Sequence, residues 1–477
     1  DADTLRILAG SEVKDMVPIL ESAASEVGVK VAFEYIGTLE GTERVATGGA
    51  DGKYDAIWFP NNRYLSLLPG ASSAVSSSVK IMTSPVVMGL KPSVAKRLGW
   101  DATAPTWAQL AAAASASKFT YGMTNPAASN SGFSALVAVA TALSGTGSAL
   151  TDADIQSVTP EMTSFFSGQK LTAGSSGFLA DRFEATPDVV DGLINYESVL
   201  LTLRPNGEQL TIITPTDGVV TSDYPLTLLS SADATKRPLF DTLTDWLTTP
   251  EVQQRIIAET NRRPGVPGID TGSTFPDQIL FETPFPNTLD VANTLISTYL
   301  ETVRAPAQTI FVLDTSGSME GDRLAALQQA LKNLAGADQS TAGGFAAFRS
   351  RERVTLIPFN DVPETPIVID IPDTDKTAAL EQIRFQADNL FADGGTAIYD
   401  SLAEAYRVAI AQKAERPDTF VSIVLMTDGE NTDGASAGDF ERFYNSLGSN
   451  ASPISTFVVL FGSANVDELT AIAQLTG

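Results

Sequence analysis

The hydrophobic positions of the chain form short runs that alternate with amphipathic stretches. Residues 5–10 (LRILAG) and 54–60 (YDAIWFP) are typical of buried strands, and the residues after Ser11 have the periodicity of a helix. Strand and helix signals alternate in this way over residues 1–262. The alternation predicts βαβ units with parallel sheet, so the expected fold class is α/β.

Two extended apolar segments lie far apart in this first part, at residues 80–90 (KIMTSPVVMGL) and 218–229 (GVVTSDYPLTLL). A second set of strands and helices lies between them. A chain that leaves one lobe, builds another and returns predicts a two-lobed domain over residues 1–263. Residues 264–305 begin with a Pro- and Gly-rich stretch and continue into a helical pattern, so we expect a linker followed by a helix.

A second α/β pattern covers residues 306–477. Its expected strands are QTIFVLD, RVTLIPF, TFVSIVLMTD and ISTFVVLFG, which are nearly continuous apolar runs. Such runs are typical of parallel strands that are buried on both faces. Amphipathic stretches such as DRLAALQQALKNLAG separate them, which predicts a Rossmann-like, doubly wound sheet.

The composition excludes several function classes. The formal net charge is −26, which argues against direct nucleic-acid binding because phosphate contacts need clustered Lys and Arg. The chain has neither Cys nor His, so disulfides, thiol catalysis, a Ser-His-Asp triad and His metal ligands are excluded. There is also no apolar run of about 18 residues, so no transmembrane helix is expected.

Small oxygen-bearing side chains follow the first strand of the second pattern. Asp314, Ser316 and Ser318 lie in FVLDTSGSME, Thr396 lies in the Gly-rich stretch FADGGTAIYD, and Asp428 follows the buried run ending in LMTD. Ligands of open α/β sheets bind beyond the carboxyl ends of the strands, so these side chains are expected to converge. Five hard oxygen donors suit Mg²⁺ or Mn²⁺, and less specifically Ca²⁺.

Residues 306–477 resemble a von Willebrand factor A (VWA) domain with a metal-ion-dependent adhesion site. The D-x-S-x-S run, the loop threonine Thr396 and the aspartate Asp428 of TDG match the family in the same order. The resemblance implies that these residues bind a metal ion and leave one coordination position open. An Asp or Glu of a protein partner would then complete the coordination.

The first part of the chain resembles the bacterial extracellular solute-binding proteins of ABC transporters, in the two-lobed type II form. LRILAGSEVKDMVPIL, YDAIWFP, PTWAQLAAA and TNPAASNSGFSAL match that family. A cleft with backbone N–H groups and hydroxyls would favour a small polar or anionic solute. The candidate contacts are Ser11, Asn61, Ser84, Asn130, Ser131, Tyr196 and Tyr224. For each of them the alternative is a capping or turn residue, and a cleft that binds only protein is a further alternative.

Other interpretations of the same residues are weaker. The DTSGS stretch alone could be a turn with an N-cap serine, and Asp314 as a phosphorylated nucleophile would want a second Asp where the chain has Ser316. We interpret Asp322, Asp361 and Asp433 as solvated loop acids. No base, nucleophile pair or cofactor loop is found, so no enzymatic activity is expected.

These patterns together predict a binding or adaptor protein of a bacterial cell envelope. We expect it to be extracytoplasmic and anchored to the membrane by a segment outside this sequence. One alternative is a substrate-binding component of an ABC-type transport system. A further alternative is a VWA accessory of a MoxR- or chelatase-type ATPase, which would be cytoplasmic.

Overall fold

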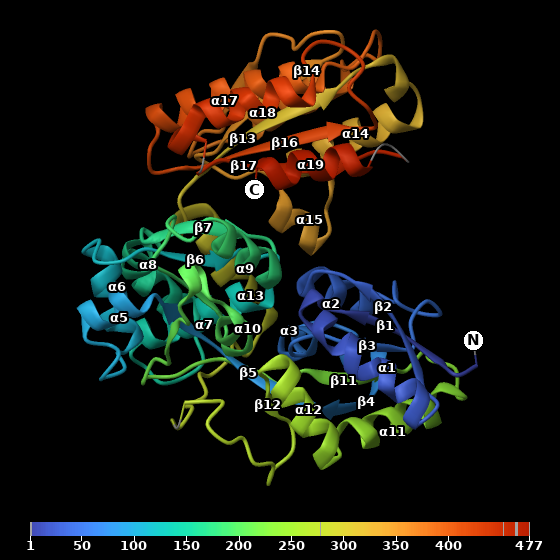
Figure 1. Ribbon diagram of the computed structural model, residues 1–477, viewed down its shortest axis with the longest axis vertical. Coiled ribbons are helices and arrows are strands. Elements are labelled where there is room, and N and C mark those ends of the chain that lie inside the picture. The colour runs from blue at the N-terminus through green and yellow to red at the C-terminus, as the bar shows by residue number, and fades with distance from the viewer. Residues whose placement is uncertain (1, 277, 452, 463–465, 477) are drawn as a thin grey trace. The chain divides into compact units, whose positions relative to one another are not determined.

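The computed structural model describes residues 2–276, 278–451, 453–462 and 466–476, and it forms two compact units (Figure 1). The first unit is Asp1–Val303 and the second is Arg304–Gly477. Both units consist of sheets covered by helices, so the predicted α/β class is confirmed. Residues 264–303, which the sequence analysis treats as linker and helix, belong to the first unit.

The first unit has two lobes, each with its own sheet. The sheet of the first lobe has the strand order β2 (Lys30–Tyr35), β1 (Thr4–Ala9), β3 (Ala56–Trp58), β11 (Pro225–Leu229) and β4 (Val75–Lys80). Strand β1 pairs in parallel with β2 and β3, whereas β11 is antiparallel to β3 and β4. The helices of this lobe are α1 (Val17–Glu26), α2 (Thr38–Ala46), α3 (Arg63–Leu67), α4 (Ala71–Ala74), α11 (Lys236–Leu247) and α12 (Pro250–Thr260).

The sheet of the second lobe has the order β10 (Thr221–Ser222), β5 (Met82–Leu90), β8 (Gly192–Tyr196), β6 (Tyr121–Thr124) and β7 (Gln169–Ala173). Strands β9 (Thr211–Ile213) and β12 (Arg263–Pro264) also pair with β5. The helices are α5 (Pro92–Leu98), α6 (Trp107–Ser115), α7 (Asn130–Ser144), α8 (Asp152–Phe166), α9 (Ser176–Ala185), α10 (Glu197–Thr202) and α13 (Leu289–Thr298).

The chain passes between the lobes at the two extended segments that the sequence singled out. The first crossing is at Ile81, which is fully buried between β4 and β5. The return strand β10 pairs with β5 through Ser222 opposite Ser84. The two segments therefore lie side by side, although more than a hundred residues that build the second lobe separate them, and the predicted two-lobed form is confirmed.

The second unit is built on one five-stranded sheet (Figure 1). The order is β15 (Ile367–Asp370), β14 (Arg353–Phe359), β13 (Ala307–Asp314), β16 (Phe420–Thr427) and β17 (Ser455–Leu460), and only β15 is antiparallel to its neighbour among these strands. The helices are α14 (Asp322–Lys332), α15 (Thr341–Ala346), α16 (Thr377–Asp388), α17 (Ile398–Glu415), α18 (Ala437–Leu447) and α19 (Val466–Thr476).

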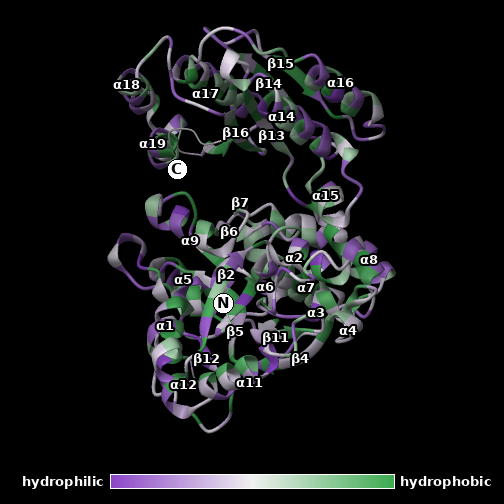
Figure 2. Ribbon diagram, turned by 90° about the vertical axis from the view of Figure 1, so that its right-hand side faces the viewer, coloured by the Kyte–Doolittle hydropathy of each residue, from purple (hydrophilic) through white to green (hydrophobic). Residues whose placement is uncertain are grey.

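Each face of this sheet has its own hydrophobic core. Ile310 and Val312 of β13 pack with residues of α17, α18 and α19, whereas Phe311 and Leu313 pack with residues of α14 and α16. Successive side chains of a strand point to opposite faces, so a strand buried on both faces must be apolar throughout. Hydropathy colouring shows hydrophobic central strands and helices of mixed character (Figure 2).

A buried ion pair joins β12, which follows the last helix of the first lobe, to α10 of the second lobe. Arg263 Nε donates to Glu197 Oε2 at 2.7 Å, and Nη2 donates to Oε1 at 2.9 Å. The side chain of Glu197 is only 1% exposed, compared with 20% for Arg263. Water cannot replace the guanidinium at this carboxylate, so the pair is expected to fix β12 in place.

We predict that Arg263→Ala destabilises the first unit by about 3 kcal/mol, because it leaves the Glu197 carboxylate buried without a cation. Denaturant unfolding followed by tryptophan fluorescence measures this, since all four tryptophans lie in the first unit. The control is Arg237→Ala, whose pair with Asp241 is 51% exposed on both sides and should contribute less than about 1 kcal/mol. Equal effects of the two substitutions would contradict the prediction.

Candidate functional site

Three loops of the second unit meet beyond the carboxyl ends of its parallel strands. The loop after β13 is joined to the Gly-rich loop before α17, because Gly317 N–H donates to Gly394 O at 3.0 Å. The Gly-rich loop is joined in turn to the loop after β14, where Asn360 O accepts from Ala397 N–H at 2.8 Å. These backbone bonds place the three loops at one edge of the sheet, as expected for an open α/β sheet.

The carboxylate of Asp314, the last residue of β13, is fully buried. Its Oδ1 accepts from the Ser316 N–H at 2.8 Å, and its Oδ2 accepts from the Thr427 hydroxyl at 2.5 Å. Burial raises the pKa of Asp314 in spite of these bonds, and the negative charge of Asp428 acts in the same direction. Asp314 takes part in no ion pair with another described residue, so no cation of the described part of the chain compensates its charge directly.

Hydroxyl groups connect this loop to Asp428, which follows the end of β16. The Ser316 and Ser318 hydroxyl oxygens are 3.0 Å apart, and the Ser318 hydroxyl donates to Asp428 Oδ1 at 2.9 Å. Arg323 donates to the other carboxylate oxygen of Asp428 and, at 3.2 Å, to Ser318 O. Four of the five residues that the sequence selected, Asp314, Ser316, Ser318 and Asp428, are therefore linked directly.

Thr396 reaches the same edge through its backbone. Its N–H donates to the Thr432 hydroxyl at 2.9 Å and to Asp433 Oδ2 at 3.2 Å, and its carbonyl accepts from the backbone N–H groups of the same two residues. The Thr396 hydroxyl takes part in no hydrogen bond between described residues. The backbone is thus held while the side-chain oxygen stays available for a ligand.

Two aspartates that we interpreted as solvated loop acids hold this loop. Asp361 Oδ1 accepts from Gly395 N–H at 2.7 Å, and Asp433 binds the next residue of the loop. A Cβ atom at position 395 would lie 1.8 Å from Asp433 Oδ2, so any other residue there would displace the carboxylates that hold the loop. The sequence signal for this role is the Gly394–Gly395 pair, which indicates a close approach of other groups to the backbone.

The donor set fits a hard divalent cation. It offers two carboxylates and three hydroxyls. Clusters of three or more His, Cys, Asp or Glu side chains that could hold a metal ion are absent from the described ranges, so the hydroxyls are needed to complete this donor set. Mg²⁺ prefers such oxygen ligands, with few carboxylates and some coordination positions left to water or another ligand. The buried Asp314 without a counter-ion and the unengaged Thr396 hydroxyl agree with this chemistry.

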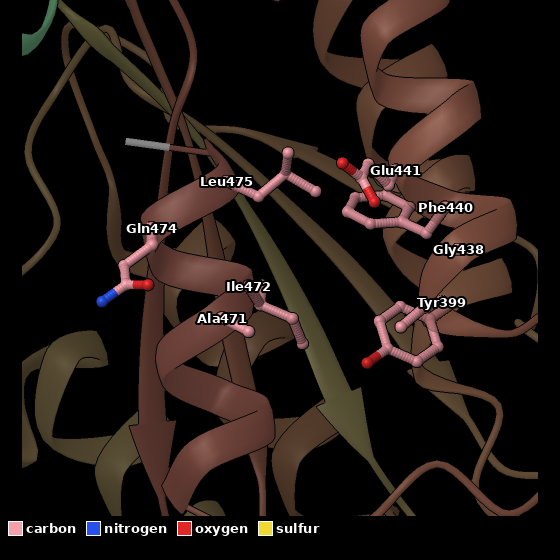
Figure 3. A pocket seen from close by; sticks show the side chains of 9 residues that line it. Tyr399, Gly438, Phe440, Glu441, Ala471, Ile472, Gln474 and Leu475 are labelled. Carbon is pink, nitrogen blue, oxygen red and sulfur yellow. The ribbon is translucent and has the colours of Figure 1, made fainter.

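A groove of about 360 Å³ lies between α18, α19 and the start of α17 (Figure 3). Phe440, Ile472 and Leu475 form part of its apolar lining. The hydroxyl of Tyr399 donates to Glu468 Oε1 at 2.6 Å, and burial together with this carboxylate raises the pKa of Tyr399. This bond ties α19 to the first turn of α17, directly after the Thr396 loop.

In the first unit, some of the predicted cleft residues bind one another across the lobes. Asn61, which follows β3, donates to Asn130 Oδ1 at 2.9 Å. Asn130 Nδ2 lies 3.0 Å from the Tyr196 hydroxyl and 3.1 Å from the Ser222 hydroxyl. Asn61, Asn130 and Tyr196 are thus brought together at the junction of the lobes, where all three are buried.

The other predicted cleft residues lie in different surroundings. The Ser131 hydroxyl is 2.8 Å from that of Thr124, and the Ser84 hydroxyl donates to that of Ser198 at 3.2 Å, so both serines form hydrogen bonds inside the second lobe. Ser11 begins a short 3-10 turn after β1 and is partly exposed.

Tyr224 stands in a buried polar cluster that the sequence did not reveal in full. Its φ angle is 40°, in the left-handed region, and its hydroxyl is buried without a hydrogen-bond partner among the described residues. The Arg262 guanidinium lies 4.8 Å from the ring centroid and donates to Asp15 Oδ2 at 2.6 Å. Glu12 also belongs to this cluster: its Oε2 is buried and has no hydrogen-bond partner among the described residues, and burial raises the pKa of Glu12.

Comparison with known families decides the identity of the first part. The family model described as "Bacterial extracellular solute-binding protein" matches residues 5–259, more than half of the chain. The chain belongs to this family. The von Willebrand factor type A domain matches residues 309–477, so this solute-binding protein carries a C-terminal VWA domain. Both kinds of domain are typically non-catalytic, and their combination supports a binding or adaptor role.

Individual relatives of this solute-binding protein are distant. Inter-alpha-trypsin inhibitor heavy chain H4 from Sus scrofa is 29% identical over 135 residues, which is 27% of this chain and 13% of that protein. The chain therefore corresponds to only a small part of that relative.

Solved periplasmic binding proteins are also similar at low identity. AfuA from Actinobacillus pleuropneumoniae shares 13% identity with a TM-score of 0.49, covering 63% of this chain and 98% of its own. A ferric binding protein from Campylobacter jejuni shares 13% with a TM-score of 0.45, covering 62% and 98%. Similarity at this level assigns no ligand to this solute-binding protein.

We predict that Asp314→Asn stabilises the metal-free VWA domain by about 1 kcal/mol, because it removes a buried charge. The Asn Oδ1 can still accept from the Ser316 N–H, and its Nδ2 can donate to the Thr427 hydroxyl oxygen once that hydroxyl reorients. The same substitution should abolish the stabilisation that Mg²⁺ gives. Calorimetric unfolding of the full chain in EDTA and in Mg²⁺ measures both effects. A metal-free variant less stable than the original protein would show that the carboxylate is already compensated.

Proposed function

We propose that the VWA domain binds a divalent cation and, through it, an acidic residue of a protein partner. The cation is Mg²⁺, with Mn²⁺ and Ca²⁺ as alternatives. Its ligands in this proposal are Asp314, Ser316, Ser318, Thr396 and Asp428. The protein then acts as an adaptor of the cell envelope that docks other proteins in a metal-dependent way.

The observation that carries this proposal is the link between Ser316, Ser318 and Asp428. The Ser318 hydroxyl contacts a carboxylate 110 positions further along the chain, at 2.9 Å. Small polar side chains that follow the ends of two different strands, β13 and β16, therefore meet at this contact. The conformation of either loop alone would not bring them together. A turn with a serine cap would need only its own backbone, so the capping alternative does not explain the contact.

In this proposal the residues of the chain bind the ion and compensate part of its positive charge. When bound, the metal ion supplies a positive charge that a partner's carboxylate can coordinate. Asp314 is fixed by the Ser316 N–H and the Thr427 hydroxyl, so it offers a negative charge in a set direction. The neutral hydroxyls of Ser318 and Thr396 add donors without further charge, which leaves the ion able to attract an external carboxylate.

Two apolar side chains stand on the loops around this site. Val362, which follows Asp361, is 62% exposed, and Phe391, five residues before Thr396, is 76% exposed. Aromatic residues, including phenylalanine, are enriched in protein interfaces relative to the rest of the surface. These residues support a protein rather than a free small acid as the occupant of the open metal position.

Membership of an extracellular solute-binding family supports an extracytoplasmic location and disfavours the cytoplasmic ATPase accessory. No helix among the described residues has the length and apolar character to cross a membrane. A substrate-binding component of a transport system is the rival function within the same compartment.

A second proposed function belongs to the first unit, which would capture or sense a small polar ligand at the junction of its lobes. Tyr224 supports it, because a non-glycine residue at positive φ with a buried, unpaired hydroxyl is stable only if its surroundings hold it there. The unpaired Glu12 Oε2 nearby adds an acceptor for the same ligand. Ser11, Asn61, Ser84, Asn130, Ser131 and Tyr196 are the other proposed contacts.

We predict that Thr396→Ala weakens Mg²⁺ binding at least about tenfold, because it removes one ligand while the loop backbone keeps its bonds. Isothermal titration of the full chain with Mg²⁺ measures the affinity. The control is Thr374→Ala, which changes an exposed loop threonine of the same domain.

A protein partner captured from envelope extract in Mg²⁺ should be lost in EDTA and with Thr396→Ala. Its retention in both cases would refute metal-bridged docking.

We predict that Tyr224→Phe changes the stability of the first unit by less than about 1 kcal/mol, because the hydroxyl forms no well-aligned hydrogen bond with a described residue and interacts only with the charge of Arg262. A ligand found by screening sugars, sugar phosphates and amino acids should bind this variant more weakly. Tryptophan fluorescence reports both the stability of the first unit and the affinity for the ligand.

The matched control is Tyr121→Phe. It removes a hydroxyl that donates to Phe165 O at 3.1 Å, so it should lower stability by about 1 kcal/mol. Unchanged affinity for a ligand of the cleft would exclude Tyr224 as a contact.

A further inference from the structure

Arg323 covers one of the candidate metal ligands. Its Nη1 donates to Asp428 Oδ2 and, at 3.2 Å, to Ser318 O, while Asp428 Oδ1 accepts from the Ser318 hydroxyl. Both oxygens of this carboxylate are therefore engaged inside the protein. Among the ion pairs of the described residues, this is the one that includes a proposed metal ligand.

The position of Arg323 is set by two loops. It is the second residue of α14, which begins after Gly321 at a φ of 86°. Gly462, in the loop after β17, has a φ of 91°, and a Cβ atom there would lie 3.1 Å from Arg323 Nε. A glycine at this point lets the loop pass close to the guanidinium, so the arginine has a defined place against Asp428.

Two cations then compete for one carboxylate. A metal ion bound by Asp428 would share that carboxylate with the guanidinium, and two positive charges at short range repel each other. The Arg323 side chain is 43% exposed, whereas that of Asp428 is 1% exposed. The arginine can therefore move out into water, where a guanidinium is well solvated, but the carboxylate cannot follow it.

We propose that Arg323 is an internal counter-ion that holds Asp428 in the metal-free VWA domain and gives it up to the metal ion. This inference rests on the proposed metal site. Arg323 neutralises the Asp428 carboxylate when no metal is present, and it lowers the affinity for the metal. Docking of the partner then responds to the concentration of the divalent cation, because the ion must first displace the arginine.

The test is isothermal titration of the full chain with Mg²⁺ and, separately, with Mn²⁺. Arg323→Gln removes the charge and keeps much of the side chain, and it should bind both ions about tenfold more tightly. Arg323→Lys keeps the charge and should stay close to the original affinity. The control is Arg407→Gln, in a surface pair with Glu404 where the arginine is 59% exposed, and it should change nothing.

A second readout separates competition from a purely structural role. In EDTA, Arg323→Gln should melt at the same or a lower temperature than the original protein, because an ion pair is lost. In saturating Mg²⁺ the upward shift of its melting temperature should be larger than for the original protein. A structural role alone would lower both melting temperatures equally, and that result would overturn the proposal.

The outcomes distinguish this inference from the proposed function. If the original protein binds Mg²⁺ and Arg323→Gln binds it no more tightly, the competition is refuted and the metal site stands. If neither protein binds either ion, both the metal site and the competition are refuted. Binding by Arg323→Gln alone would overturn the proposal that Arg323 gives up Asp428 to the metal ion, since the arginine would then exclude the metal from the original protein.

Discussion

The buried carboxylate at the end of the central strand is the constraint on which the second unit depends. Strand β13 lies between β14 and β16, and its side chains fill a core on each face of the sheet. The strand must therefore end in the interior, and Asp314 is fully buried there. A charge in this position needs hydrogen bonds from the surrounding loops, and it receives them from the Ser316 N–H and the Thr427 hydroxyl.

That requirement explains why this site could be predicted from the sequence. Continuous apolar runs mark parallel strands buried on both faces, and the carboxyl ends of such strands share one edge. The D-x-S-x-S run follows such an end directly, so Asp314 and Ser318 are placed by local geometry once the strand is placed. The crossing segments of the first unit were predictable for a similar reason, because two long apolar stretches far apart in the chain can both be buried by pairing with each other.

The residues that support the sites were not predictable, because their roles depend on contacts distant in sequence. Asp361 and Asp433 lie in polar loops and look like solvated acids until the Gly395 backbone is seen beside them. For the predicted cleft residues the sequence erred in the other direction, because it selected side chains that are already hydrogen-bonded within the protein. Ser84 and Ser131 have the position of ligand contacts in the sequence, but their hydroxyls already bond to Ser198 and Thr124 inside the second lobe. Pattern identifies where a polar side chain is needed, but it does not identify its partner.

Each unit places an arginine against an acidic group at its site, and exposure separates the two cases. Arg262 is 1% exposed and bonds to Asp15 and to the backbone of Glu12, so its guanidinium is held in the interior of the first unit. Arg323 is 43% exposed at its pair with Asp428. A buried guanidinium that left its carboxylate would lose both charge compensation and solvation, whereas a partly exposed one exchanges a carboxylate for water. The first arrangement suits a rigid junction between lobes, and the second suits a site whose cation can be replaced by a divalent ion of higher charge.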